Sequence, residues 1–412
     1  MNKSLIDARR ARIGVFGFFV FAGFVMGLWA AGLPSLDERL DLGAGLLGTV
    51  LLLISGGALV SMLAAGPLVD RFGSRRVCWV AGPLSALTLL GPALAPSYAT
   101  LAALAVVFGI GLGACEVAMN AHSVEVERAY GRPIISAFHG TWSLGGAAGG
   151  ALTALFLRVG VDPQLVLVVA AVVVALLYLP AARLLLPSVP ASPEAAPGEA
   201  KGGTGGSLTW GLIALLGLAA FAGHLSEGAA IDWAALHARW VLGTDPAAAP
   251  LAYTIFSVAM TTVRLLGDPI RARLGSVRTI QLAGLLATAG YGLVLLSPLA
   301  PEALRVACAW SGWALAGVGL ATVVPVLFSA VGAAGERVGR ALAMVTAFGY
   351  SGMLIGPGVL GYVADVASLP VALIIPAALA AVVSLAGVPA MRSLLRASPP
   401  ASAAPLPEPA RD

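Results

Sequence analysis

Apolar stretches of about 20 residues recur along almost the whole chain, and they constrain its fold more than any other feature, since each matches the thickness of the bilayer hydrocarbon. Composition agrees, because 59% of the residues are hydrophobic, only 11% are charged and the mean hydropathy is +0.93. We therefore predict an all-α integral membrane protein with twelve spans. The predicted spans are 13–33, 44–69, 77–95, 100–123, 134–157, 164–186, 208–234, 247–266, 279–296, 303–330, 341–363 and 370–388.

Basic residues indicate the orientation of these spans, because they are retained on the cytoplasmic side during insertion. With the N-terminus inside, only Arg39, Arg158, Arg239 and Arg305 of the 24 Lys and Arg residues fall in outward loops. Both termini are thus predicted to be cytoplasmic in a bacterial inner membrane. The same asymmetry accounts for the net charge of +4, so nucleic acid is not expected as a partner.

Composition also divides the chain. Residues 187–207 are rich in Pro, Gly and Ala without apolar periodicity, which predicts a flexible cytoplasmic linker. We expect a six-helix half at 1–186, a second at 208–396, and a disordered Pro/Ala-rich tail at 397–412.

The two halves repeat in sequence. Trp29-Ala30-Ala31 recurs as Trp233-Ala234-Ala235, and Gly109-Ile110-Gly111-Leu112 recurs as Gly317-Val318-Gly319-Leu320, at offsets of 204 and 208. Phe72-Gly73-Ser74-Arg75-Arg76 has a weaker counterpart 202 residues later, Leu274-Gly275-Ser276-Val277-Arg278. The nearly constant offset predicts two parallel six-helix pseudo-repeats, a transporter design in which the solute binds between the halves near the midplane.

The turn after the second span carries the most specific local pattern. It combines two glycines with an Asp-Arg pair and two further arginines: Gly66, Asp70, Arg71, Gly73, Arg75 and Arg76. Physically, Gly66 would allow close helix approach and Gly73 would make the turn. This run resembles the signature loop of the major facilitator superfamily (MFS), which implies that its charges latch the cytoplasmic face when the transporter opens outward. A degenerate second copy contains Gly267, Asp268, Arg271, Arg273 and Gly275.

A narrower resemblance to the fucose-permease-like branch of bacterial facilitators rests on Glu116-Val117-Ala118-Met119-Asn120, Phe138-His139 and Ser143-Leu144-Gly145. In that branch a glutamate of the fourth span takes part in proton coupling and substrate binding. The first span here lacks the acidic residue found in the sugar symporters of the branch.

Ionisable side chains within a span are costly and therefore functional candidates. Glu116 and Asn120 share a helix face, and His139 falls in the same inner half of the membrane by its position along the fifth span. We expect Glu116 to exchange protons, with Asn120 and His139 as hydrogen-bonding partners. The alternative is a satisfied structural network without proton transfer.

Further candidates for the cavity wall lie in the fifth, seventh and eighth spans: Trp142, His224, Glu227, Tyr253, Ser257 and Thr261. The last three form a polar stripe with Arg264, for which helix–helix hydrogen bonding is an equally good explanation. Arg264, near the end of the same span, is expected to pair with Asp268, four residues on. His122 and His237 sit at predicted helix ends, where solvated side chains are expected.

These observations predict a secondary active transporter of a small solute, coupled to protons and working by alternating access as a monomer. Efflux of amphipathic compounds by the same fold is the alternative, and a non-transporting membrane sensor is a further one. No nucleophile–base pair, metal-ligand set or phosphate-binding motif is evident in the sequence, so we expect neither an enzyme nor a cofactor or metal.

Overall fold

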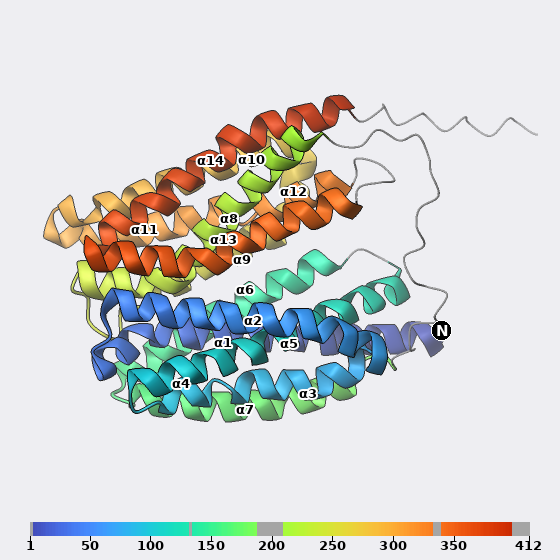
Figure 1. Ribbon diagram of the computed structural model, residues 1–412, viewed down its shortest axis with the longest axis horizontal. Helices are drawn as coiled ribbons and strands as arrows, with labels where there is room; N and C mark the ends of the chain where they lie inside the picture. Colours follow the sequence, from blue (N-terminus) through green and yellow to red (C-terminus); the bar gives the residue numbers. More distant parts are fainter. Residues whose placement is uncertain (1–2, 132–133, 188–208, 333–338, 398–412) are drawn as a thin grey trace, which may run out of the picture.

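The computed structural model describes residues 3–131, 134–187, 209–332 and 339–397, and every regular element in these ranges is helical (Figure 1). Nearly all of the expected linker and tail lies outside the described residues. The first group of helices comprises α1 (Lys3–Leu40), α2 (Gly43–Phe72), α3 (Ser74–Leu87), α4 (Leu90–Leu94), α5 (Tyr98–Tyr130), α6 (Ile135–Arg158) and α7 (Pro163–Arg183).

The second group follows residue 209. It comprises α8 (Trp210–Leu236), the π-helical turn η2 (His237–Val241), α9 (Pro250–Leu265), α10 (Gly267–Leu296), the 3-10 turn η3 (Ser297–Leu299), α11 (Glu302–Leu320), α12 (Val323–Gly332), α13 (Gly339–Val366) and α14 (Leu369–Ala397).

The helices are long and apolar enough to form a multi-pass membrane protein. Ten segments in the described residues meet the length and hydropathy needed to cross a bilayer. The two other predicted spans, 134–157 and 247–266, correspond to α6 and α9. The all-α membrane fold is therefore confirmed, and the helix count agrees approximately with the predicted twelve.

Prolines follow three breaks between helices; two of these breaks interrupt the predicted spans 77–95 and 303–330, and the third falls at the predicted end of the span 247–266. The breaks lie between α3 and α4, between α9 and α10, and between α11 and α12, shortly before Pro92, Pro269 and Pro325 respectively. A proline lacks the N–H that would bond to the carbonyl four residues earlier, and its ring clashes with that carbonyl. The eighth span consequently continues past Leu266 as far as Gly275.

Equivalent glycines support the internal repeat. Gly73, between α2 and α3, has φ 81° and ψ 145°, and Gly275, inside α10, has φ 73° and ψ 159°. This backbone region is essentially restricted to glycine. Close helix packing repeats as well, because a Cβ on Gly109 would overlap the Ile54 carbonyl and one on Gly317 would overlap the Phe256 carbonyl.

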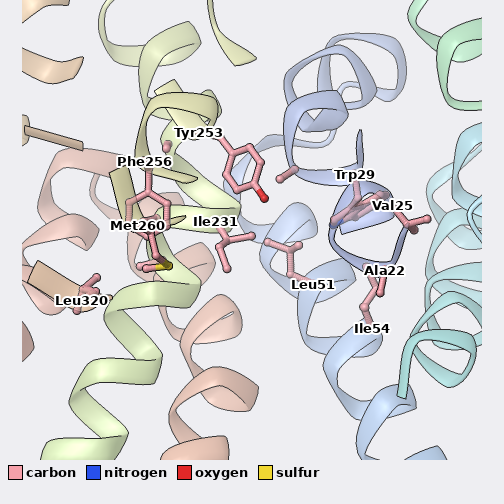
Figure 2. Close-up of a cluster of buried hydrophobic side chains, with 14 of the residues drawn as sticks. Ala22, Val25, Trp29, Leu51, Ile54, Ile231, Tyr253, Phe256, Met260 and Leu320 are labelled. Atoms are coloured by element: carbon pink, nitrogen blue, oxygen red, sulfur yellow. The ribbon is translucent and has the colours of Figure 1, made fainter. Parts of the chain in front are cut away.

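Buried apolar side chains join the two groups at the centre of the molecule. Figure 2 shows Trp29 of α1 and Leu51 of α2 on one side, with Ile231 of α8 and Tyr253 of α9 on the other. All four are buried. Most of α8 is buried too, so polar side chains on it lie inside the protein rather than against lipid.

The two ends of the molecule differ. We call the end at which the N-terminus lies the basic end, because α2, α5, α7 and α14 finish there with arginines in their last turns. At the other end, here called the opposite end, Gly48 of α2 contacts Gly361 of α13, and Trp240 Nε1 donates to Asp37 over 2.9 Å. Towards the basic end, a Cβ on Gly56 or Gly66 of α2 would meet no atom of the described residues within 4 Å. The two groups accordingly diverge towards the N-terminal end in Figure 1.

Candidate functional site

An ion pair inside the bundle connects both groups of helices. Arg264 of α9 donates from Nη2 to Glu227 Oε1 of α8 over 2.8 Å, and from Nη1 to Ser143 Oγ of α6 over 2.7 Å. The side chains of Arg264 and Glu227 are only 14% and 8% exposed. A charge-assisted bond in such surroundings is strong, and each charge would be costly without the other.

Arg264 reaches this position because α9 is broken after Leu265 and the span continues beyond it. The residue therefore lies well inside the span, roughly 15 Å from the turn at Gly275 at 1.5 Å per residue. Its described partner is Glu227, while the side chain of Asp268, the partner expected from the sequence, lies outside the described residues. From the sequence, Arg264 was predicted only as a member of a polar stripe and Ser143 only as part of the family resemblance, and their bond to each other was not predicted.

His139 lies beside the ion pair. It precedes Ser143 by four residues on α6 and so shares its face. Its ring contacts Phe19 of α1 edge-on, with the ring centroids 5.1 Å apart. The imidazole also lies within electrostatic range of Arg264 and Glu227. Although protein surrounds it on most sides, its side chain is exposed, so water reaches it inside the bundle.

Glu116 occupies a different environment from Glu227. Its side chain is partly exposed yet enclosed by protein, and it accepts no hydrogen bond from any residue that the structure describes. Asn120 Nδ2 donates over 2.9 Å to the backbone carbonyl of Glu116 rather than to its carboxylate. His139, the other expected partner, lies with the ion pair.

Tyr350 of α13 connects these two environments and was not found from the sequence. It is 40% exposed, and the charges of both Glu116 and Glu227 act on its hydroxyl. Its ring lies 5.5 Å from that of His224, whose Nδ1 is 2.9 Å from the Ala220 carbonyl. An uncharged aromatic residue in a glycine-rich span does not stand out in the sequence. Only the packing of α13 against α8 shows that Tyr350 belongs to the candidate site.

The remaining sequence candidates are mostly buried in helix packing. Tyr253 lies against Gly146 and Gly150 of α6. Thr261 Oγ1 donates over 2.7 Å to the Ser257 carbonyl of its own helix, and both side chains are buried. Trp142 is partly buried, and its backbone lies against Gly23.

A pocket of about 320 Å³ lies elsewhere, at the opposite end. Asp37, Asp41, Trp240 and Asp365 contribute to its lining, and the indole N–H of Trp240 is already bonded to Asp37. No group of three or more His, Cys, Asp or Glu side chains suited to a metal ion occurs among the described residues.

The first copy of the loop motif is open in this structure. Asp70 and Arg76 are exposed, and the Arg71 guanidinium stacks on Phe72 at 5.3 Å. Gly73 makes the turn as expected, whereas the close helix approach expected at Gly66 is absent because that glycine faces open space.

The second copy is only partly described, since the side chains at positions 267 and 268 lie outside the described residues. Arg271 donates to Ser276 Oγ over 3.2 Å and to Ser329 Oγ of α12 over 2.6 Å. Arg273 is exposed, and Gly275 makes the turn.

The expectation of solvated histidines at helix ends is wrong. His122 and His237 are 0% and 1% exposed. His122 Nε2 accepts from the Leu186 N–H over 3.1 Å, and its Nδ1 lies 2.8 Å from Ser74 Oγ. These contacts connect three elements at the basic end, which no pattern within one helix could reveal.

Comparison with known proteins now decides the family. The model of the family described as Major Facilitator Superfamily matches residues 14–334. This chain belongs to the major facilitator superfamily. An MFS-type transporter of Yersinia pestis is 33% identical over 355 residues, which cover 86% of this chain and 89% of the relative. A transporter of Sinorhizobium fredii is 34% identical over 379 residues, covering 90% and 96%.

Solved structures show the same MFS fold. The D-xylose–proton symporter superimposes with a TM-score of 0.71 at 16% identity, covering 92% of this chain and 96% of that one. The nucleoside transporter NupG gives a TM-score of 0.64 at 14% identity, covering 96% and 100%. The chain is therefore an MFS membrane transporter and not an enzyme, as the loop motif predicted; the fucose-permease-like branch stays a prediction.

Proposed function

We propose that this transporter moves a small polar solute together with, or in exchange for, protons, by alternating access between halves at 1–186 and 208–396. The linker at 187–207 and the tail at 397–412 would then lie in the cytoplasm. The observation that carries the proposal is Glu116, a carboxylic acid inside the bundle that is partly exposed and has no counter-charge among the described residues. Such a group changes its protonation state more readily than one held in an ion pair.

Contacts between the groups support alternating access. They are close at the opposite end, through Gly48 and Gly361, whereas at the basic end Asp70 is exposed and no atom of the described residues lies within 4 Å of a Cβ on Gly66. By the distribution of basic residues, the basic end is cytoplasmic in a bacterial inner membrane. The conformation is then open inward, the state in which the family's cytoplasmic latch is released.

Polar groups from both halves support a polar solute. His139 of α6 and Tyr350 of α13 offer hydrogen-bonding groups to water, while Arg264 and Glu227 lie beside them. The proposed wall of the solute-binding cavity also includes Trp142, His224 and Asn120. Efflux of amphipathic compounds remains the second candidate, favoured by the exposed ring of Phe348, 50% exposed near Tyr350 on the same helix.

The test is uptake and release of a solute panel in proteoliposomes under an imposed pH gradient. Wild type should accumulate or expel a solute in response to the gradient, whereas Glu116→Gln should still exchange solute but lose the response. Glu302→Gln, at an exposed position in the first turn of α11, makes the same chemical change away from the site and serves as the control. Full gradient-driven transport by Glu116→Gln would exclude this carboxylate as the proton site.

A further inference from the structure

The two glutamates of the site differ in how their charge is balanced. Glu227 has Arg264 within 2.8 Å, so the pair adds no net charge to the interior. Glu116 has no such partner among the described residues: none of the ion pairs found there includes it, and Asn120 bonds to its backbone carbonyl rather than to its carboxylate. The titratable groups within electrostatic range of the Glu116 carboxylate are Tyr350 of α13 and Cys115 of the same helix as Glu116.

Arg264 cannot serve as the missing counter-charge in this conformation. Its guanidinium is already bonded to Glu227 over 2.8 Å and to Ser143 over 2.7 Å, so its charge is paired. The site then carries one uncompensated negative charge whenever Glu116 is ionised and the nearby histidines are neutral, because Arg264 balances the charge of Glu227 alone. In a medium of low dielectric constant, an added anion would be strongly disfavoured and an added cation favoured.

The surroundings of Glu116 would suit a cation larger than a proton. Tyr350, from the other group of helices, has its hydroxyl within electrostatic range of Glu116, and its side chain is 40% exposed. An aromatic face attracts a cation at short range, and water can deliver a solute to the carboxylate because its side chain is partly exposed.

From this arrangement we propose that the transported solute is an organic amine, and that its ammonium group replaces the proton on Glu116. The inference rests on the proposed function and narrows its substrate class and coupling mode. One proton leaves the Glu116 carboxyl group for water as one ammonium group pairs with the resulting carboxylate, so the charge of the site is unchanged. Each binding event therefore exchanges one positive charge for another, which makes the transporter a proton/amine antiporter.

The experiment measures binding to the purified full chain with two sets of compounds that differ mainly in charge. One set is tyramine, tyrosol and 4-hydroxyphenylacetate; the other is glucosamine, glucose and glucuronate. Thermal stabilisation reports binding, and a pH indicator in weak buffer reports proton release. We expect at least one amine to stabilise the protein and release about one proton, with its Kd rising about tenfold for each pH unit of acidification.

Variants separate the carboxylate from the rest of the site. Glu116→Gln, which keeps the shape of the side chain, should lose both amine stabilisation and proton release while unfolding near the wild-type temperature. Glu116→Asp should retain proton release with weaker binding. Glu302→Gln should behave as wild type.

Several results would overturn the inference: no stabilisation by either amine, equal stabilisation by a neutral or anionic member of a set, amine binding without proton release, or amine binding retained in Glu116→Gln. Gradient-driven accumulation of a neutral solute, lost in Glu116→Gln, would reject the amine while leaving the proposed function intact. Transport indifferent to the gradient for every solute would instead reject the proposed function.

Discussion

Arg264 of α9 and Ser143 of α6 are joined by a hydrogen bond of 2.7 Å that connects the two groups of helices within the bundle. The same guanidinium holds Glu227, so a single side chain links α6, α8 and α9. This link makes the ion pair both a stability determinant and a constraint on movement between the groups.

We predict that Arg264→Gln destabilises the protein more than Arg264→Gln combined with Glu227→Gln. The single change leaves a buried carboxylate without its partner, at a cost of about 3 kcal/mol or more, whereas the double change removes both charges. Thermal unfolding in detergent measures the difference. Equal losses in the two variants would show that the pair contributes no coupling energy.

Gly48→Leu should open the opposite end. A side chain at this position meets Gly361 of α13, so the contact between the groups cannot form as it does here. A cysteine introduced at Ala44, in a chain carrying Cys308→Ser, should then react several-fold faster with a membrane-impermeant maleimide added from that side. Gly56→Leu is the matched control, because it lies on the same helix with open space around it; a similar increase in this variant would contradict the assignment.

Alanine at Gly73 or Gly275 should destabilise the protein by roughly 1–3 kcal/mol each, because both glycines adopt a backbone region that a Cβ makes unfavourable. Gly66→Ala should be nearly neutral, since its φ is ordinary and no atom lies near its Cβ position. Melting temperatures of the three variants measure this. A large loss from Gly66→Ala with none from the other two would refute the turn assignment.

His122→Leu should cost about 1–3 kcal/mol, because the Leu186 N–H and the Ser74 hydroxyl lose their common partner. His122→Gln, which keeps an acceptor and a donor, should recover part of the loss. Unfolding temperatures compare the two. If Gln and Leu lose stability equally, the volume of the ring matters and its hydrogen bonds do not.

The candidate site was only partly visible in the sequence. Glu116, His139 and Glu227 could be selected because ionisable groups are rare in apolar spans. Their partners could not, since Arg264 bonds to residues 37 and 121 positions away, and Tyr350 carries no charge. The burial of His122 was missed for the same reason, because Ser74 and Leu186 come from other elements.

The sequence by itself determined the membrane spans, the internal repeat, the loop motif and hence the family. These features are local: hydropathy over about 20 residues decides insertion, and Gly73 and Gly275 specify their turns through their own backbone freedom. Only the tertiary structure decided that Arg264 pairs with Glu227, that Glu116 has no charged partner among the described residues, and that the two groups meet at the opposite end. Those properties depend on contacts between α2, α6, α8, α9 and α13, which are distant in the chain and meet only when the helices pack.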